Sequence, residues 1–231
     1  MASKGNNSYW IPLSDLMTVL MVTFLFIAVI YIAKVQVATK GIIDLQQKKQ
    51  ELLDELNKEF KEDFKSSKWN AVLDSNNLSI RFVNEDVMFG QDEDILKDQF
   101  KSILADFFPR YLKIILQEKY TNKIAEVRIE GHTSEEGTYE HNLDLSQRRT
   151  QKVMTFLRNL PAFKFLNDED KSKMKFWLTA NGLSSGRLID KNGKLTYETK
   201  LSADPQKCRR VEFRIVTTSS REIDSYKSKI K

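Results

Sequence analysis

The first feature of the chain is a continuous apolar run from residue 10 to residue 33, which reads WIPLSDLMTVLMVTFLFIAVIYIA and contains one charge. A helix of this length spans about 36 Å, and the hydrocarbon core of a bilayer is about 30 Å thick. Tyr9 and Trp10 at one end, and Tyr31 near the other, stand where interfacial aromatic residues are common. The pattern predicts a transmembrane helix over residues 10–33, preceded by a short tail of residues 1–9.

A cleaved signal peptide is the alternative interpretation of this run. It is disfavoured because the apolar stretch is too long and the segment before it carries only Lys4. In addition, no small-x-small cleavage pattern follows Tyr31. We therefore expect the helix to stay in the mature protein as a membrane anchor.

A polar connector, residues 34–76, follows the apolar run. Up to residue 68 its apolar positions recur at spacings of three, four and seven, which is typical of an amphipathic helix. Two interpretations remain open: the apolar stripe pairs with a second copy as a short coiled coil, or it packs on its own domain. The stripe consists of Leu45, Leu52, Leu53, Leu56, Phe60 and Phe64.

Residues 77–217 alternate between strand-like and helix-like segments, and residues 218–231 form a C-terminal tail. Alternating apolar positions predict strands, and apolar positions spaced three and four apart predict helices. The resulting order, β-α-β-α-β-β, specifies an α+β domain with helices on one face of a sheet. Strands are expected at 78–83, 124–130, 175–180 and 210–216, helices at 95–119 and 144–160, and a long loop at 181–204.

Composition narrows the function classes. The net charge is +5, and because Lys4 and Asp15 cancel within residues 1–33, all of it belongs to residues 34–231. Such mild basicity suits a carboxylate-rich wall polymer or a weak nucleic-acid binder, but interleaved charges are most often an ordinary solvated surface. Cys208 is the single cysteine, so no intrachain disulfide forms.

Catalytic and metal-binding signatures are missing from the sequence. It contains no G-x-x-x-x-G-K-[ST], G-x-S-x-G or H-E-x-x-H motif. His132 and His141 are nine residues apart with no cysteine nearby, which disfavours a zinc site. We expect a protein that is not an enzyme and that holds no cofactor or metal.

Asp15 is the first candidate functional residue. An ionised carboxylate inside a membrane helix costs several kcal/mol, so such a residue is usually functional. Ser14 and Thr18 supply hydroxyl groups next to it that are suited to sharing the coordination of an ion. The alternative is an aspartate near the helix end whose carboxylate reaches the interface.

A second candidate site lies at residues 129–153, which read IEGHTSEEGTYEHNLDLSQRRTQKV. This segment resembles the OmpA-like signature, a strand leading to G-H/Y-T-D-x-x-G, then N-x-x-L-S-x-x-R on a helix. The KFWLTANG and RRVEFRI segments are similar to the later strands of that family. The matching positions are Gly131, His132, Thr133, Gly137, Asn142, Leu145, Ser146, Arg149 and Val153.

The resemblance implies that the loop after the strand and the start of the next helix bind the diaminopimelate of a peptidoglycan stem peptide. A guanidinium on the helix suits bidentate binding of a carboxylate. One position departs from the family pattern: Ser134 stands where an aspartate is usual, and Glu135 or Glu136 is a candidate to compensate. The expected peptidoglycan-binding residues are Thr133, Ser134, His141, Asn142, Leu145 and Arg149.

A single membrane helix containing W-I-P-L-S-D-L-M before an OmpA-like domain resembles the MotB family of ion-driven stators. Within that family, the sequence is most similar to the ZorB branch, which belongs to Zorya anti-phage defence. The resemblance implies that Asp15 carries transported H⁺ or Na⁺, with Ser14 and Thr18 beside it. It also implies two copies of this chain inside a ring of five MotA-like (ZorA) subunits. The domain would be held on peptidoglycan, and no nucleic acid would be bound directly.

The same resemblance implies an inner-membrane protein with a cytoplasmic N-terminus and a periplasmic domain. The distribution of lysines favours the opposite orientation, because positively charged residues flanking a membrane helix are enriched on its cytoplasmic side. Only Lys4 precedes the helix, whereas Lys34, Lys40, Lys48 and Lys49 follow it. We give the domain more weight than the lysines. Two alternative functions remain open: a flagellar-type stator subunit, and a passive tether between membrane and cell wall.

Overall fold

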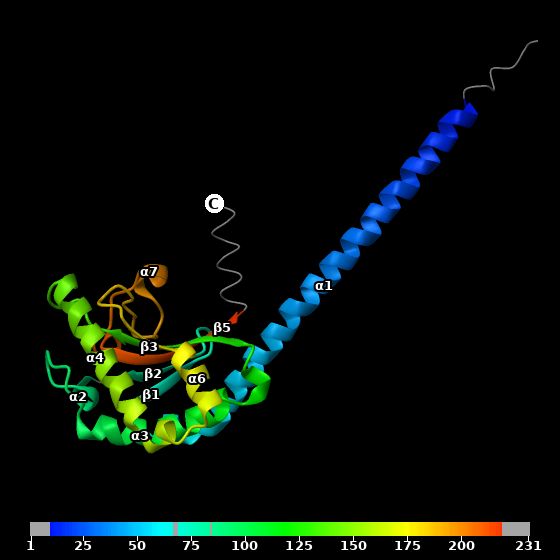
Figure 1. The fold of residues 1–231 in the computed structure, drawn as a ribbon. Coiled ribbons are helices and arrows are strands. Elements are labelled where there is room, and N and C mark those ends of the chain that lie inside the picture. The colour runs from blue at the N-terminus through cyan, green and yellow to red at the C-terminus, as the bar shows by residue number, and fades with distance from the viewer. Residues whose placement is uncertain (1–9, 67–68, 84, 219–231) are drawn as a thin grey trace, which may run out of the picture. The chain divides into compact units, whose positions relative to one another are not determined.

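The computed structural model describes residues 10–66, 69–83 and 85–218, which divide into two compact units, Met1–Gln47 and Lys48–Lys231 (Figure 1). The predicted tail at residues 1–9 lies outside the described residues, as do residues 219–231 of the predicted C-terminal tail and the side chains of Trp10 and Leu45. Each unit is described by itself.

Helix α1, Trp10–Lys65, contains the predicted membrane segment. Its stretch Leu13–Gln36 has a mean hydropathy of 2.7 and buries none of its side chains within the chain. Thr18 and Thr23 donate their hydroxyl hydrogens to the backbone oxygens of Ser14 and Leu20, so these polar groups are satisfied inside the helix. The stretch is long and apolar enough to cross a membrane, as predicted for residues 10–33.

The last part of α1 belongs to the second unit. Leu52, Leu56 and Phe60 are at most 1% exposed and lie in the same core cluster as the sheet and the other helices. Of the two interpretations left open for the apolar stripe, packing on its own domain holds for these three residues. The compact unit consequently begins at Lys48 instead of residue 77.

Five strands form one sheet in the order β1-β2-β5-β3-β4. All neighbours are antiparallel except β3 and β4, which are parallel. A parallel pair needs a crossover connection, and the chain supplies it through the helices between β3 and β4. The strands are β1 Ala71–Asp74, β2 Ser79–Val83, β3 Ile124–His132, β4 Leu178–Gly182 and β5 Arg210–Thr217.

The long helices of the domain cover one face of this sheet. Figure 1 shows α3, α4 and α6 on one side and the segment that carries α7 on the other. The predicted α+β architecture is thereby confirmed. The helices are α2 Glu85–Met88, α3 Asp98–Ile115, α4 Tyr139–Asn159, α5 Pro161–Lys164, α6 Asp168–Trp177, α7 Thr196–Thr199 and α8 Pro205–Cys208, with a 3₁₀ turn at Glu118–Tyr120.

The structure differs from the sequence-based expectations at four places. Residues 175–177 of the predicted strand 175–180 are helical, because Asn167 caps α6 by accepting from the Asp170 amide and the helix runs on to Trp177. Helix α4 begins at Tyr139 instead of residue 144, because Thr138 caps it. Strand β1 was not predicted, and the expected loop 181–204 contains α7 and an antiparallel bridge between Ile189 and Leu195.

Alternation along the strands separates the two faces of the sheet. Odd positions of β3 and β5, such as Val127, Ile129 and Phe213, are buried with the helices. Charged residues occupy most of the even positions: Glu126, Arg128, Glu130, Arg210, Glu212 and Arg214. Aromatic rings fill the apolar side: Phe107 has ring centroids 5.2 Å from Phe60 and 5.0 Å from Phe213. Helix α1 and the sheet thus share one continuous core.

We expect Leu56→Ala to lower the free energy of unfolding of the second unit by about 2–5 kcal/mol, because it opens a cavity in that core. Denaturant unfolding of the full chain in detergent, followed by tryptophan fluorescence, measures this loss. Leu201→Ala is the matched control, since Leu201 is 50% exposed, and its effect should stay within about 0.5 kcal/mol. Equal effects of the two variants would show that α1 does not belong to the core.

Candidate functional site

A cavity of about 610 Å³ opens where β3 ends and α4 begins. All six residues predicted to bind peptidoglycan line it: Thr133, Ser134, His141, Asn142, Leu145 and Arg149. The structure therefore brings together side chains from the turn after β3 and from successive turns of α4. The other lining residues are Asp86, Gln91, Asp92, Glu136, Gly137 and Arg209.

Two glycines set the position of α4 over the sheet. A Cβ on Gly131 would lie 2.7 Å from Cγ2 of Thr150, and a Cβ on Gly182 would lie 2.4 Å from the amide nitrogen of Gln147. Gly131 and Gly182 are register partners on the parallel strands β3 and β4. Their missing side chains allow the helix to approach both strands closely, which explains why the motif has glycine at position 131.

Asn142 shapes the turn that forms one wall of the cavity. Its side-chain amide donates to the backbone oxygen of Glu136 at 2.7 Å and to that of Ser134 at 3.4 Å. Gly137 adopts a φ of +88°, a conformation that glycine accepts without steric cost. The turn between β3 and α4 is thus fixed before any ligand enters.

Arg149 holds a second wall in place. Its Nε donates to the backbone oxygen of Glu93 at 2.8 Å, its Nη2 donates to that of Gly90 at 3.2 Å, and its guanidinium carbon lies 4.8 Å from the ring centre of Phe89. The residue is only 4% exposed. Because two of its nitrogens are bound to backbone oxygens, Arg149 builds the cavity as well as lining it.

Two further residues expected to bind peptidoglycan complete the rim and the interior of the cavity. His141 Nε2 lies 2.6 Å from a carboxylate oxygen of Asp92, and both side chains are about half exposed at the mouth. Thr133 is 4% exposed, and its hydroxyl has no hydrogen-bond partner among the described residues. A buried hydroxyl in a cavity wall is a group that a ligand can satisfy.

Sequence reasoning missed the wall formed by the segment between β2 and α3. Asp86, Gln91 and Asp92 come from this segment, and Arg209 comes from the junction of α8 and β5. The only local sign was the acidic run after Gly90, residues 91–94, which reads QDED. Its approach to α4 depends on Arg149, which is 56 residues away from Glu93 in sequence.

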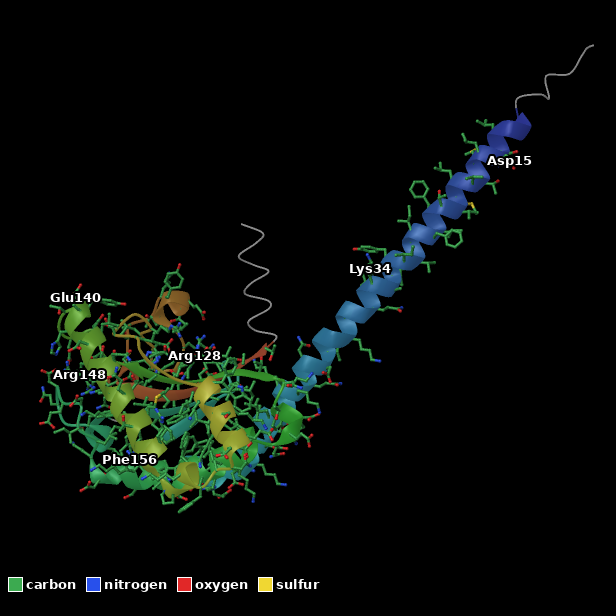
Figure 2. The ribbon with its side chains drawn as sticks, in the orientation of Figure 1. Asp15, Lys34, Arg128, Glu140, Arg148 and Phe156 are labelled. Carbon is green, nitrogen blue, oxygen red and sulfur yellow. The ribbon has the colours of Figure 1, made fainter. Side chains whose placement is uncertain are left out.

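The residues predicted for ion transfer lie in the other unit. Figure 2 shows Asp15 on the N-terminal stretch of α1. Asp15 lies inside the apolar span, and Thr18 follows three residues later in the same helix. Thr18 donates its hydroxyl hydrogen to the backbone oxygen of Ser14 at 2.8 Å. A hydroxyl that donates its hydrogen in this way keeps the lone pairs that a cation needs.

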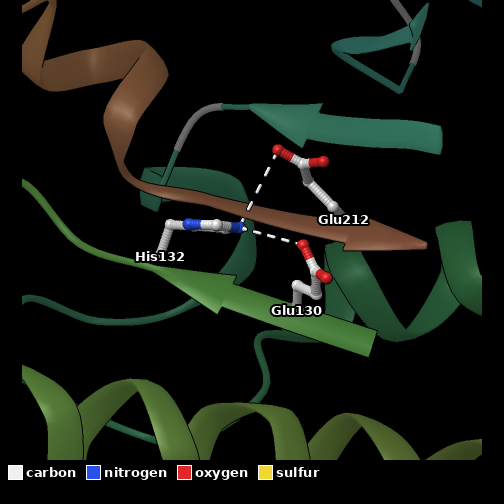
Figure 3. A group of neighbouring side chains, drawn as sticks. All are labelled: Glu130, His132 and Glu212. Carbon is white, nitrogen blue, oxygen red and sulfur yellow. Dashed lines mark ion pairs between the residues drawn. The ribbon is translucent and has the colours of Figure 1, made fainter. Parts of the chain in front are cut away.

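The charged face of the sheet contains the one group in the described residues with three potential metal ligands: Glu130, His132 and Glu212 (Figure 3). The ring nitrogen Nε2 of His132 lies 3.7 Å from Glu130 and 3.8 Å from Glu212. Arginines already form ion pairs with both carboxylates, so their positive charge would repel a metal cation at this position. We interpret the group as an ion-pair layer; its arginines are Arg81, Arg187, Arg210 and Arg214.

This layer shifts the pKa values of its members. Burial, followed by the charge of Arg210, lowers the pKa of His132 to about 4. Burial by itself would raise the pKa of Glu212, but Arg210 and Arg81 outweigh it and hold that pKa at about 2. The layer also holds the segment between β4 and β5 in place. Arg210 donates to the backbone oxygen of Arg187, and Arg81 donates to the backbone oxygen of Gly193.

Residues 88–196 match the model of the OmpA family. Zorya protein ZorB of the Crooks strain of Escherichia coli is 36% identical over 94% of this chain and 92% of its own length. Zorya protein ZorB of Escherichia coli O139:H28 is 24% identical over 79% of this chain and 75% of its own.

Solved structures with partial overlap include a MotB-like protein of Desulfovibrio vulgaris, with a TM-score of 0.48, 18% identity and coverage of 74% of this chain and 93% of that one. The periplasmic domain of Helicobacter pylori MotB has a TM-score of 0.39 and 16% identity, covering 66% and 83%.

Residues 88–196, which include most of the cavity lining, therefore belong to an OmpA-family domain, and one apolar helix precedes that domain. At 36% identity over nearly its whole length, the chain belongs to the ZorB family.

We expect the second unit to lose stability as the pH falls from 6.5 towards 4. Over this range His132 binds a proton in the unfolded chain but not in the folded one, so the loss approaches about 3 kcal/mol. Below pH 4.5, protonation of Glu212 in the unfolded chain adds to it, since its folded pKa is about 2. Denaturant unfolding at a series of pH values measures this slope.

His132→Gln is the control for this experiment, because glutamine does not titrate. The free energy of unfolding of this variant should fall clearly less between pH 6.5 and 4 than that of the wild type. An unchanged slope would show that other groups cause the acid sensitivity.

Proposed function

We propose that this chain is the wall-anchored, ion-carrying subunit of a MotA/MotB-type motor complex that acts in anti-phage defence. The observation that carries the proposal is the convergence on one cavity of all six residues expected to bind peptidoglycan, in a chain whose apolar helix contains a carboxylate. The ZorB relatives support the defence role through their names. The alternative function, a flagellar-type stator subunit, would use the same mechanism and would differ only in driving a flagellum.

The cavity suits a peptidoglycan stem peptide chemically. Such a peptide presents carboxylates, an ammonium group and an aliphatic arm at the same residue. Arg149 and Arg209 offer positive charge, Asp92 and Glu136 offer negative charge, and Leu145 offers an apolar contact. A cavity that carries both signs of charge favours a zwitterionic ligand over a simple anion.

Ion transfer is assigned to Asp15. A carboxylate in an apolar helix binds H⁺ or Na⁺ when a neighbouring subunit shields it from lipid, and Ser14 and Thr18 add oxygen ligands. Binding of the ion to Asp15 would change the contacts of this residue with a MotA-like partner. In the proposed complex, five MotA-like subunits surround two copies of this chain. Binding to the wall keeps the pair of chains from turning with that ring.

The proposed topology is a single pass through the inner membrane, with the N-terminus in the cytoplasm and the domain in the periplasm. The lysines after the helix oppose this orientation, whereas a peptidoglycan-binding domain requires it. Because the wall lies only outside the inner membrane, wall-dependent behaviour in living cells distinguishes the two orientations.

We expect Arg149→Ala to weaken binding of the full chain to purified sacculi at least tenfold, because it removes a cation from the cavity and releases the wall at Gly90 and Glu93. Co-sedimentation of the detergent-solubilised protein measures the binding. Arg148→Ala is the matched control: Arg148 is the neighbouring residue on α4, pairs with Asp144 and does not line the cavity. If both variants bind like the wild type, the cavity is not the wall-binding site.

We expect Asp15→Asn to abolish phage protection while the complex with the MotA-like subunit still assembles, because an amide cannot take up and release a proton. The assay expresses the variant with its neighbouring genes and co-purifies the complex. Asp44→Asn makes the same change on α1 outside the apolar span and should keep protection. Full protection by Asp15→Asn would favour the passive tether.

A further inference from the structure

The missing aspartate at position 134 leaves a chemical gap in the cavity. Ser134 is 5% exposed and carries no charge, so it cannot balance an ammonium group of a ligand. Of the two glutamates that follow it, Glu135 does not line the cavity. Glu136 does line it, but its carboxylate lies 3.5 Å from Nη1 of Arg209, whose guanidinium is permanently charged and balances it, unlike an imidazole partner.

Asp92 faces the same cavity from the opposite wall. Its carboxylate lies at the mouth, with a side chain 63% exposed and its partner His141 2.6 Å away on α4. An exposed carboxylate binds a cation without the desolvation cost of a buried one. His141 is one of the residues expected to bind peptidoglycan, so this contact places Asp92 directly beside the expected binding residues.

The backbone around Asp92 is built to hold it there. Asp92 adopts a φ of +56°, a left-handed conformation that costs energy for a residue with a side chain and is tolerated best by asparagine and aspartate. The segment is fixed on both sides of Asp92 by the two hydrogen bonds from Arg149 to Gly90 and Glu93. Local strain held in place by a buried arginine is typical of a functional position.

We infer that Asp92 is the ammonium-recognising residue of this cavity and takes over the role of the carboxylate absent at position 134. The inference rests on the proposed wall-binding function and adds a specificity determinant to it. Thr133, the buried hydroxyl without a partner among the described residues, meets the ligand from inside. The cavity consequently selects stem peptides whose diaminopimelate amine is unmodified.

The test measures binding of two soluble probes to the full chain in detergent by isothermal titration calorimetry. One probe is a stem tetrapeptide with meso-diaminopimelate, and the other is the same peptide acetylated on the diaminopimelate side-chain amine. The wild type should bind the first about tenfold more tightly, which corresponds to about 1.4 kcal/mol. Asp92→Asn should reduce this preference to less than about twofold, and Asp92→Asn with Ser134→Asp should restore part of it.

Asp94→Asn is the matched control, because Asp94 lies on the same segment but does not line the cavity; it should keep the wild-type preference. A preference that survives Asp92→Asn, or that disappears instead in Glu136→Gln or Asp86→Asn, overturns the inference and leaves wall binding intact. Failure of the wild type to bind either probe or sacculi overturns the proposed wall-binding function itself. Circular dichroism of each variant verifies that its fold is retained.

Discussion

The cavity depends on the contact between the Arg149 guanidinium and the backbone oxygens of Gly90 and Glu93. This contact joins the middle of α4 to the segment before α3, two parts of the chain that are 56 residues apart. Without it, the cavity would keep the wall after β3 but lose the one that carries Asp92. Charge-assisted bonds to backbone oxygens suit this task, because they fix the course of the chain whatever the side chains around it.

A second constraint comes from the division of the sheet into two chemically different faces. The apolar face contacts the long helices and the last turns of α1, while the charged face holds the segment from residue 183 to 209 through arginines. Because Arg209 directly precedes β5 and lines the cavity, the charged layer also helps to position the site. One sheet thereby serves both the core and the cavity.

The sequence was most informative where a motif and a periodic pattern coincided. The strand before Gly131 and the helix carrying Asn142, Leu145 and Arg149 were predictable, because their spacing places three side chains on one face of a helix. The wall from residues 86–92 was not predictable, since its position depends on a long-range contact. The strand predicted at residues 175–180 failed because a short apolar run fits a helix end as well as a strand.

The end of α1 shows the same limit. Its apolar stripe could be found in the sequence, but periodicity does not say which surface a helix covers. Only the tertiary packing of Leu52, Leu56 and Phe60 decides that these residues belong to the domain core. Helix α1 thus contributes both to the apolar span and to the core of the OmpA-family domain, with one functional carboxylate proposed in the first and one binding cavity proposed in the second.

The most direct measurement of the central claim is fluorescence recovery after photobleaching of the fluorescently tagged full chain in living cells, before and after enzymatic removal of the wall. We expect a largely immobile population in intact cells that becomes mobile once the peptidoglycan is digested. Such a result requires both a periplasmic domain and wall binding. Equal mobility before and after digestion would contradict the wall-anchored account.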